Sequence, residues 1–171
     1  MLNALRRNAE KTRLVHALHA ELTRQARLPV FFRDLQVPDT IDGRFDMVAL
    51  HAWMVFGRLK TAGMGEVAQG LSNAMFVGFD EALRDLGTGD MGMGPRMKKI
   101  GNAFNGRMQA YEAATDEAAL AEAIQRNVYR GEAGHEAPAL SLARYALAAR
   151  ARLAQCDPAT GTLDFGPGPT T

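Results

Sequence analysis

The sequence predicts an all-α protein, and three observations carry this prediction. Apolar residues recur three and four positions apart along most of the chain, which is the period of an amphipathic helix. No stretch of useful length alternates β-branched and polar residues as a half-buried strand does. Met is plentiful whereas Trp and Tyr are scarce, with nine Met against one Trp and three Tyr. The length of 171 residues suits a single globular domain, of about six to seven helices.

The first expected helix covers about residues 3–27. Leu18 and Leu22 fall on one apolar stripe, while Arg13 and Arg24 lie near the opposite side. This is the pattern of a basic amphipathic helix. A proline ends it, and a short apolar turn follows.

The second long helix is expected to begin near Asp42, whose carboxylate can accept from the free N–H groups of the first turn. It contains the run Met47–Phe56, which is apolar on every side and interrupted only by His51. The run is too short for a bilayer, which needs about 20 apolar residues, so protein must cover it. We interpret His51 as a neutral core histidine, with contact to a partner as the alternative. The expected core face comprises Phe45, Val48, Ala49, Ala52, Val55, Phe56 and Leu59.

A third helix over about 66–86 carries an apolar stripe that includes Met75 and Phe79, and we expect it to be buried over a wide arc. A Gly-rich loop follows at 87–94. The fourth helix then starts with Pro95 in its first turn. We expect the third and fourth helices to cover the central one through Met75, Phe79, Ile100 and Phe104.

The fourth helix is expected to end near residue 114. Thr115 or Asp116 caps a fifth helix, and a sixth runs over about 138–155. The remaining tail, from 156, is rich in Gly, Pro and Thr, so we expect it to be extended and mobile at its end.

Three segments describe the organisation of the chain. They are the basic N-terminal helix (1–27), a helical body (28–155) and an extended, partly flexible tail (156–171).

The charges nearly balance, with 20 Lys and Arg against 19 Asp and Glu. The global basic field that holds nucleic acid is missing, and we expect no specific nucleic-acid partner. The single cysteine, Cys156, cannot form a disulfide within the chain, and no charged start followed by an apolar segment precedes a cleavage site. These features favour a reducing, cytoplasmic compartment.

The segment Gly87–Gly92 spells G-x-G-x-x-G, the fingerprint of a dinucleotide-binding turn. A helix rather than a strand is expected before it, and the Lys-Ser/Thr pair of a P-loop is missing. A flexible connection between helices is therefore the favoured interpretation. The alternative function is a helical small-molecule or nucleotide-binding domain that uses Gly87–Gly94.

Other chemistry has little support in the sequence. The four histidines and the acidic residues show no ligand spacing for zinc or calcium. Cys156 has no neighbouring histidine to activate it, and no nucleophile elbow occurs. We therefore expect no metal, no cofactor and no catalytic residues, and hence a protein that is not an enzyme.

A cluster of basic and Met residues follows the Gly-rich loop. Lys98 and Lys99 lie close to Met91 and Met93. Flexible thioether side chains adapt to varied apolar partners, and a basic rim orients acidic ones. This composition is typical of a protein-binding surface, with an ordinary solvated face as the alternative. The basic first helix likewise suits an anionic membrane, although a solvated helix face is the favoured interpretation.

Three stretches carry a family resemblance. They are V-P-D-T-I-D-G-R-F-D-M with the following H-A-W (Val37–Trp53), L-G-T-G-D-M-G-M-G-P-R-M-K-K-I (Leu86–Ile100) and A-F-N-G-R-M-Q-A-Y (Ala103–Tyr111). Together they resemble the ubiquinol-cytochrome c chaperone family, the assembly factors of respiratory complex III. The resemblance covers about residues 28–145 and leaves out the first helix. Asn105 departs from the family, whose members commonly carry Tyr there.

The resemblance implies an all-α, cofactor-free bacterial chaperone. Its implied client is cytochrome b, nascent or newly inserted, and its role is to promote assembly of the cytochrome bc complex at the cytoplasmic face of the membrane. The resemblance leaves several points undecided: peripheral contact with the membrane or the ribosome, the oligomeric state, and the need for a second chaperone subunit. For Trp53 a pure core role is an equal alternative to partner contact, and the His51 end of that motif is where we expect an unfilled cleft. The resemblance implies that the following residues contact a partner: Arg44, Trp53, Met91, Met93, Lys98, Lys99 and Arg107.

Overall fold

The computed structural model describes residues 2–85, 87 and 89–169, without the side chains of residues 2, 4, 90 and 91. Its helices are α1 (Leu2–Ala26), α2 (Pro29–Arg33), α3 (Ile41–Thr61), α4 (Gly65–Asp85), α5 (Asp90–Glu112), α6 (Glu117–Asn127), α7 (Glu136–Leu153) and the 3₁₀ turn η1 (Pro158–Thr160). No strand occurs in this part of the chain, so the all-α prediction is confirmed.

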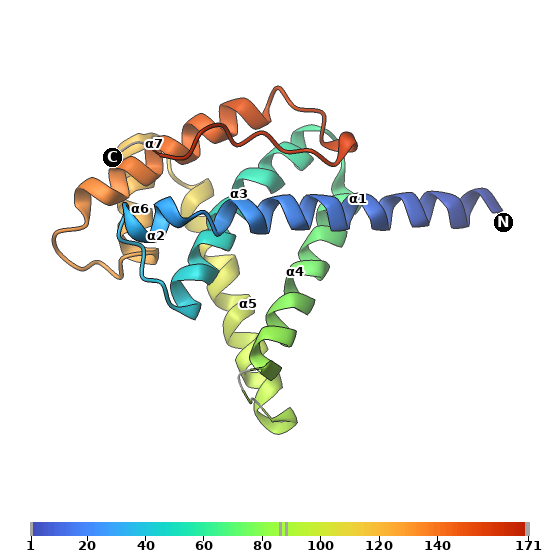
Figure 1. Ribbon diagram of the computed structural model, residues 1–171, viewed down its shortest axis with the longest axis horizontal. Helices are drawn as coiled ribbons and strands as arrows, with labels where there is room; N and C mark the ends of the chain where they lie inside the picture. Colours follow the sequence, from blue (N-terminus) through green and yellow to red (C-terminus); the bar gives the residue numbers. More distant parts are fainter. Residues whose placement is uncertain (1, 86, 88, 170–171) are drawn as a thin grey trace.

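Helix α3 lies at the centre of the fold and contacts α1, α4, α5 and α7 (Figure 1). Every residue from 47 to 55 is buried, which confirms the prediction from its apolar run. Met75 and Phe104 are buried against this core, whereas Phe79 and Ile100 are only partly covered. Complete burial of a large apolar side chain contributes about 1.5–3 kcal/mol, so α3 supplies much of the stabilisation.

The first turn of α3 is capped by a residue other than the expected one. Thr40 has extended backbone angles, and its hydroxyl accepts from the Gly43 N–H at 3.1 Å. Asp42 instead lies inside the first turn, where a carboxylate interacts favourably with the positive end of the helix dipole. The helix thus begins at Ile41, close to the expected position, but the capping role expected for Asp42 is wrong, because Thr40 two positions earlier is the cap.

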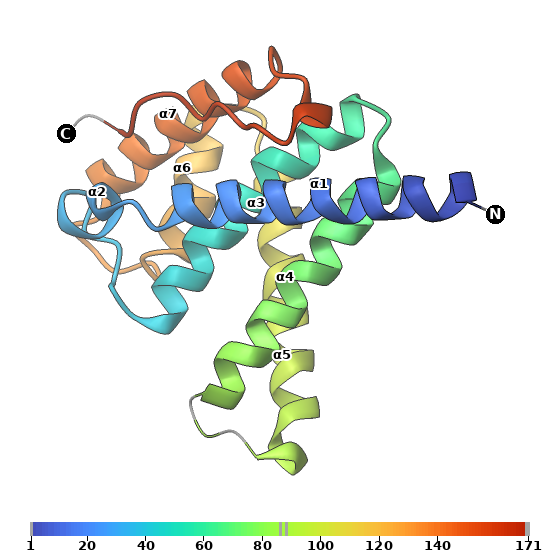
Figure 2. The same ribbon diagram turned by 45° about the vertical axis from the view of Figure 1, so that its right-hand side comes forward.

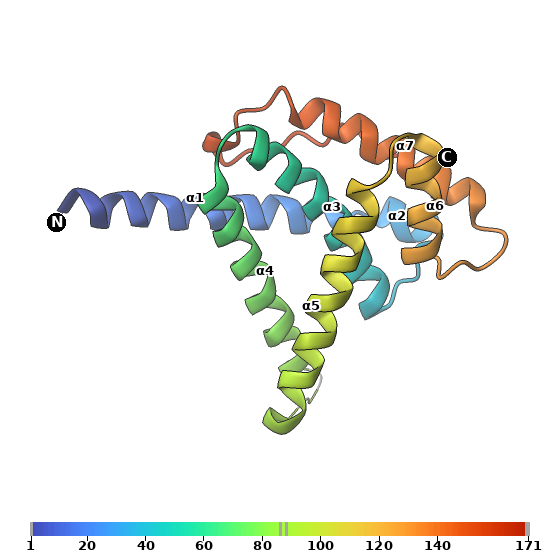
Figure 3. The same ribbon diagram turned by 180° about the vertical axis from the view of Figure 1, so that it is seen from behind.

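Helices α4 and α5 form a hairpin that projects away from the body (Figures 1 and 3). The buried residues of α4 are Val67, Leu71 and Met75, all in its first half. Beyond them Ala82 is exposed. The expected burial of this helix over a wide arc is wrong for its second half, because that half leaves the body with α5 as its main neighbour.

The Gly-rich segment is partly helical, which also corrects a prediction. Gly89 is the N-cap of α5, the Gly92 N–H donates to the Gly89 carbonyl at 3.0 Å, and Pro95 lies inside the helix. Because Pro has no N–H, α5 lacks one backbone hydrogen bond there. The fourth helix thus starts at Asp90, and Pro95 is not in its first turn.

Helices α6 and α7 form a second antiparallel pair behind α3. The Asp116 carboxylate accepts from the Ala119 N–H at 2.8 Å, so Asp116 rather than Thr115 is the cap of α6. Helix α7 packs directly against α3, whereas α6 packs on α7 and α5.

The C-terminal segment is extended beyond η1 and returns along α7 and α1 (Figures 1 and 2). Leu163 and Phe165 are buried, with 4% and 3% of their surface exposed. Arg152 of α7 pairs with Asp164 at 2.6 Å. The segment therefore belongs to the core, which its composition did not indicate.

Within the described residues, no helix combines the length and the apolar character that crossing a bilayer requires.

Candidate protein-interaction surface

Five aromatic side chains form a continuous row across α3, α4 and α5, which we call the phenylalanine strip. The ring centroids of Phe45 and Phe79 lie 5.3 Å apart, and those of Phe79 and Phe76 lie 5.7 Å apart. Phe104 lies 5.6 Å from Phe76 and 6.3 Å from Phe56. All four pairs are edge-to-face, a favourable geometry for aromatic rings.

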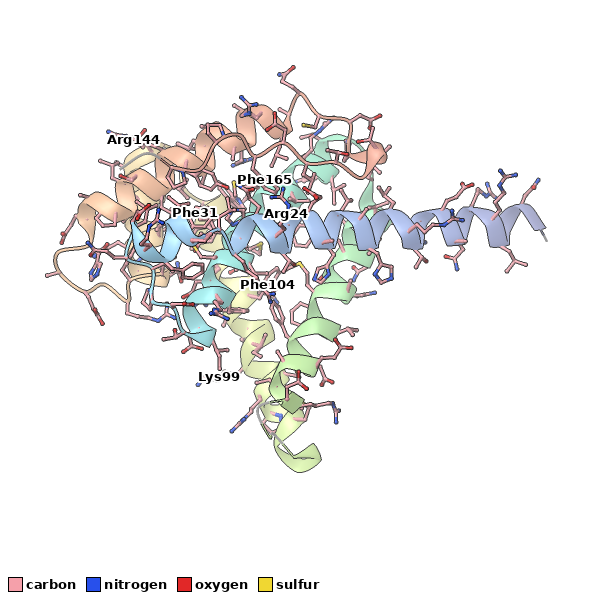
Figure 4. The ribbon with its side chains drawn as sticks, in the orientation of Figure 1. Arg24, Phe31, Lys99, Phe104, Arg144 and Phe165 are labelled. Atoms are coloured by element: carbon pink, nitrogen blue, oxygen red, sulfur yellow. The ribbon has the colours of Figure 1, made fainter. Side chains whose placement is uncertain are left out.

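Four of the five rings of the strip are partly exposed to solvent. Only Phe104 is buried, at 3% exposure, whereas Phe45, Phe56, Phe76 and Phe79 are each partly exposed. Figure 4 shows Phe104 between the helices where the hairpin joins the body. A contiguous apolar surface of this kind marks a site of interaction with a protein or a membrane.

Helical periodicity predicts a core position for Phe45, Phe56, Phe79 and Phe104. Phe45 and Phe56 have the helical spacing of the buried face of α3, and spacing alone does not reveal how far the neighbouring helices extend over it. Phe76 and Phe79 lie three residues apart on one side of α4, which is also the spacing of a buried stripe, so the sequence does not signal their exposure.

The strip continues along α5 through Met97, Ile100 and Met108, which are all partly exposed. Met93, a predicted partner contact, is buried at 6% exposure. Met91 was predicted likewise, but its side chain lies outside the described residues. The adaptable thioethers on this surface are therefore Met97 and Met108 rather than Met93.

Arg107 ties one end of the strip to a buried carboxylate. Its guanidinium lies 5.0 Å from the centre of the Phe45 ring and donates to Asp46 Oδ1, with Nε at 2.7 Å and Nη2 at 2.6 Å. Arg130, in the loop after α6, pairs with Asp46 Oδ2 at 2.8 Å. Because Asp46 is fully buried, the Arg107 charge is mainly compensated inside the protein.

Exposed cations on the hairpin and at the start of α3 include Arg44, Lys98 and Lys99. Arg44 adjoins Phe45 and pairs with Asp39 at 2.7 Å, with more than half of each side chain exposed. Figure 4 shows Lys99 beside α5, pointing away from the helix. These predicted cations are thus exposed on the hairpin and at the start of α3, and their contact with a partner stays a prediction.

Trp53 lies apart from these residues. It is 4% exposed, and its indole N–H donates to Glu112 Oε2 at 3.0 Å. The Arg150 guanidinium lies 4.3 Å from the centre of its ring. In this conformation Trp53 is a core residue and presents no surface to a partner.

His51 is fully buried in a polar cluster. Its Nδ1 lies 2.7 Å from the Met47 carbonyl and its Nε2 lies 2.8 Å from the Tyr145 hydroxyl. Gln25 Nε2 donates to the same hydroxyl at 3.0 Å. Desolvation lowers the pKa of His51 to about 4, opposed by the hydrogen bond to Met47. The interpretation as a neutral core histidine is confirmed.

The expected cleft at the His51 end of the motif is not found, because His51 and Trp53 are both covered. One surface groove in the described part of the chain lies instead at the α2 end of α1, lined by Arg27, Pro29, Phe32, Arg33, Asp39 and Arg44. A second lies where α1 passes the turn between α3 and α4.

The Gly-rich segment lacks the context of a nucleotide site. A helix, α4, precedes Gly87, and residues 90–94 are helical. A dinucleotide-binding turn requires a strand before the glycines and pyrophosphate at the following helix start. In the same described residues, His, Cys, Asp and Glu side chains do not gather in groups of three that could hold a metal ion.

The fold and this surface define an all-α protein built around one buried helix, with an apolar, cation-rimmed surface suited to binding another polypeptide. The family model of the ubiquinol-cytochrome C chaperones matches residues 33–160. The chain belongs to this family, and its role is that of a chaperone in the assembly of complex III.

Comparison with solved structures agrees. The chain is similar to the crystal structure of the Cbp3 homolog from Brucella abortus, with a TM-score of 0.84 and 32% sequence identity. The match covers 97% of this chain and 96% of that one, so it includes α1, which lies outside the family model. The comparison with curated proteins found no match.

Proposed function

We propose that this chaperone binds newly synthesised cytochrome b and promotes its incorporation into the cytochrome bc complex at the cytoplasmic face of the membrane. The phenylalanine strip is the observation that carries the proposal. A client with membrane-spanning segments exposes long apolar stretches before it is assembled. A protein that holds such a client needs an open apolar surface with neighbours that can adjust to it.

The strip meets this requirement. Burial of a fully exposed aromatic side chain contributes about 1.5–3 kcal/mol. Covering the exposed part of each ring in the strip contributes a fraction of this, so several rings together support reversible binding. Met97 and Met108 can repack around different segments because the thioether side chain is flexible and unbranched. Lys98 and Lys99 supply positive charge that orients the client with little effect on folding.

Deletion of the gene tests the physiological role. The deletion strain should lose assembled complex III and its cytochrome b, as measured by haem spectra and native gels, while unrelated respiratory complexes persist. Normal complex III in that strain would contradict the proposal.

Charge reversal on the hairpin tests the surface. Lys98→Glu with Lys99→Glu should reduce co-purification of cytochrome b and leave the melting temperature nearly unchanged, because exposed charges contribute little to folding. The matched control is Arg126→Glu with Arg144→Glu, which makes the same change of charge on α6 and α7, where both arginines are exposed. Equal capture of cytochrome b by the hairpin variant and the wild type would remove these lysines from the binding surface.

A further inference from the structure

The charge of this chain is concentrated on α1. Residues 1–27 contain six Lys and Arg and two Glu, whereas the rest of the chain contains fourteen Lys and Arg and seventeen Asp and Glu. The first segment therefore has a formal charge of +4 and the remainder −3, although the whole chain has +1. A nearly neutral protein thus carries one strongly basic element.

Three of the four arginines of α1 form one outward row. Arg6, Arg13 and Arg24 are seven and eleven residues apart, so they fall within about 20° of one another around the helix. All three are exposed, while Leu18 and Leu22 on the opposite side are fully buried. We call these arginines, together with Arg27, the arginine face.

Helix α1 lies across one side of the molecule and its N-terminal part projects beyond the body (Figures 1 and 3). Figure 4 marks Arg24 on this helix, near its α2 end. Leu5, on the projecting part, is 64% exposed. With 25 residues, α1 is about 37 Å long, which is a straight basic edge with apolar surface at its end.

Local carboxylates do not neutralise this face. Arg6 pairs with Glu10 at 3.4 Å and Arg24 pairs with Glu21 at 2.9 Å. The arginine side chains of these pairs are 81% and 59% exposed. Exposed ion pairs are weak, so either guanidinium can exchange its partner for an external anion.

The arginine face continues beyond the helix. Arg27 lines the surface groove that Arg33 and Arg44 also line, together with Pro29, Phe32 and Asp39. Within this groove Arg44 pairs with Asp39 at 2.7 Å. The basic surface therefore extends from the projecting end of α1 to a groove lined by three arginines, one carboxylate and two apolar side chains.

We propose that α1 docks this chaperone on an anionic lipid bilayer, with the arginine face on lipid phosphates and Leu5 in the headgroup region. A helix that lies in the plane of a membrane needs cations along one face and apolar side chains beside them, and juxtaposed Lys and Arg side chains bind anionic lipids. The exposed Leu5 favours a membrane over a nucleic acid. This inference rests on the proposed function, since it names the surface that holds the chaperone where its client is inserted.

Vesicle sedimentation of the full chain tests the docking surface. The vesicles contain phosphatidylcholine alone, or roughly three parts of it to one of phosphatidylglycerol. The wild type should bind the anionic vesicles, release from them as salt is raised, and ignore the neutral ones. Arg6→Glu with Arg13→Glu should reduce binding roughly tenfold or more, while the control variant Arg126→Glu with Arg144→Glu should bind as the wild type does.

Three results would overturn the proposal: no binding of the wild type to anionic vesicles, equal losses in the two double variants, or binding to a random-sequence RNA in place of the vesicles. Co-purification of cytochrome b in detergent, measured for the same variants, separates this proposal from the proposed function. Retained client capture with lost vesicle binding supports both. If the wild-type protein binds anionic vesicles but does not co-purify cytochrome b, only the proposed client is contradicted.

Discussion

At the scale of single residues, His51 shows how a polar group is accommodated in the apolar centre of α3. Both ring nitrogens have partners, at Met47 and Tyr145, so the buried neutral imidazole is fully satisfied. The sequence predicts this role because a single histidine in an otherwise apolar run is buried with it, and a buried histidine is stable only when it is neutral and hydrogen-bonded. The sequence could not identify Tyr145, which lies 94 positions away along the chain.

The lowered pKa of His51 predicts a pH dependence of stability. Its folded pKa of about 4 lies below the ordinary 6.5, so the unfolded chain binds more protons between these values and stability falls as pH falls through that range. From pH 7 to pH 5 the loss attributable to His51 is about 2 kcal/mol. Denaturant unfolding of wild type and His51→Gln should show a shallower decline in the variant. The pKa of His19 is also lowered, and comparing the two proteins removes its contribution. Identical slopes would contradict the prediction.

Asp46 joins three elements through one carboxylate. Burial raises the pKa of Asp46 because desolvation disfavours the charge, and the guanidinium groups of Arg107 and Arg130, at 2.6 and 2.8 Å, oppose this rise. Arg130 holds a left-handed backbone conformation, with φ at 58°, which is strained for a residue with a side chain.

Replacement of Asp46 by Asn should therefore destabilise the protein. We expect about 2–3 kcal/mol, less than for a fully buried pair because Arg130 can reach solvent. The control Arg126→Ala, on an exposed pair, should change stability by about 0.5 kcal/mol or less. Equal unfolding midpoints for Asp46→Asn and the control would show that the carboxylate does not hold these elements together.

At the scale of elements, periodicity was sufficient to predict the helices but not their neighbours. The α3 run could be assigned to the core because all its faces are apolar. The second half of α4 has a similar stripe, yet the hairpin carries it away from the body, so rings such as Phe79 stay partly exposed. The Gly-rich start of α5 misled because glycine disfavours helix on average, whereas Gly89 and the first turn form one here.

The tail is the element whose packing the sequence least revealed. Its composition predicts an extended chain, but the alternation of Leu163 and Phe165 places both under cover. The Phe165 ring centroid lies 5.4 Å from that of His51, so the tail seals the polar cluster from solvent.

Truncation of Phe165 tests this role. Phe165→Ala should cost about 3–5 kcal/mol in the free energy of unfolding, as for other buried aromatic side chains. Thr162→Ala, an exposed position in the same segment, provides the comparison and should be nearly neutral. If Phe165→Ala melts at the wild-type temperature, the tail is not part of the core.

At the scale of the whole molecule, two surfaces serve two proposed contacts. The hairpin with the base of α3 presents the phenylalanine strip, and α1 presents the arginine face. The strip emerged only from the structure, because exposure depends on where α4 and α5 leave the body. The arginine row of α1 was visible in the sequence, since the spacing of Arg13 and Arg24 already placed them opposite the leucines.

Capture of newly synthesised cytochrome b by the tagged full-length chain tests the central claim most directly. Phe79 and Val77 lie two residues apart on α4. Phe79 contacts Phe45 within the strip, whereas Val77 is 58% exposed and is not one of the rings of the strip. Phe79→Ser should reduce captured cytochrome b roughly tenfold and Val77→Ser should leave it unchanged, with thermal melts confirming that both variants fold. The hairpin lysine variant serves as a second probe if Phe79→Ser is unstable. Wild-type capture by a folded Phe79→Ser protein, or equal losses in the Phe79 and Val77 variants, would contradict the account.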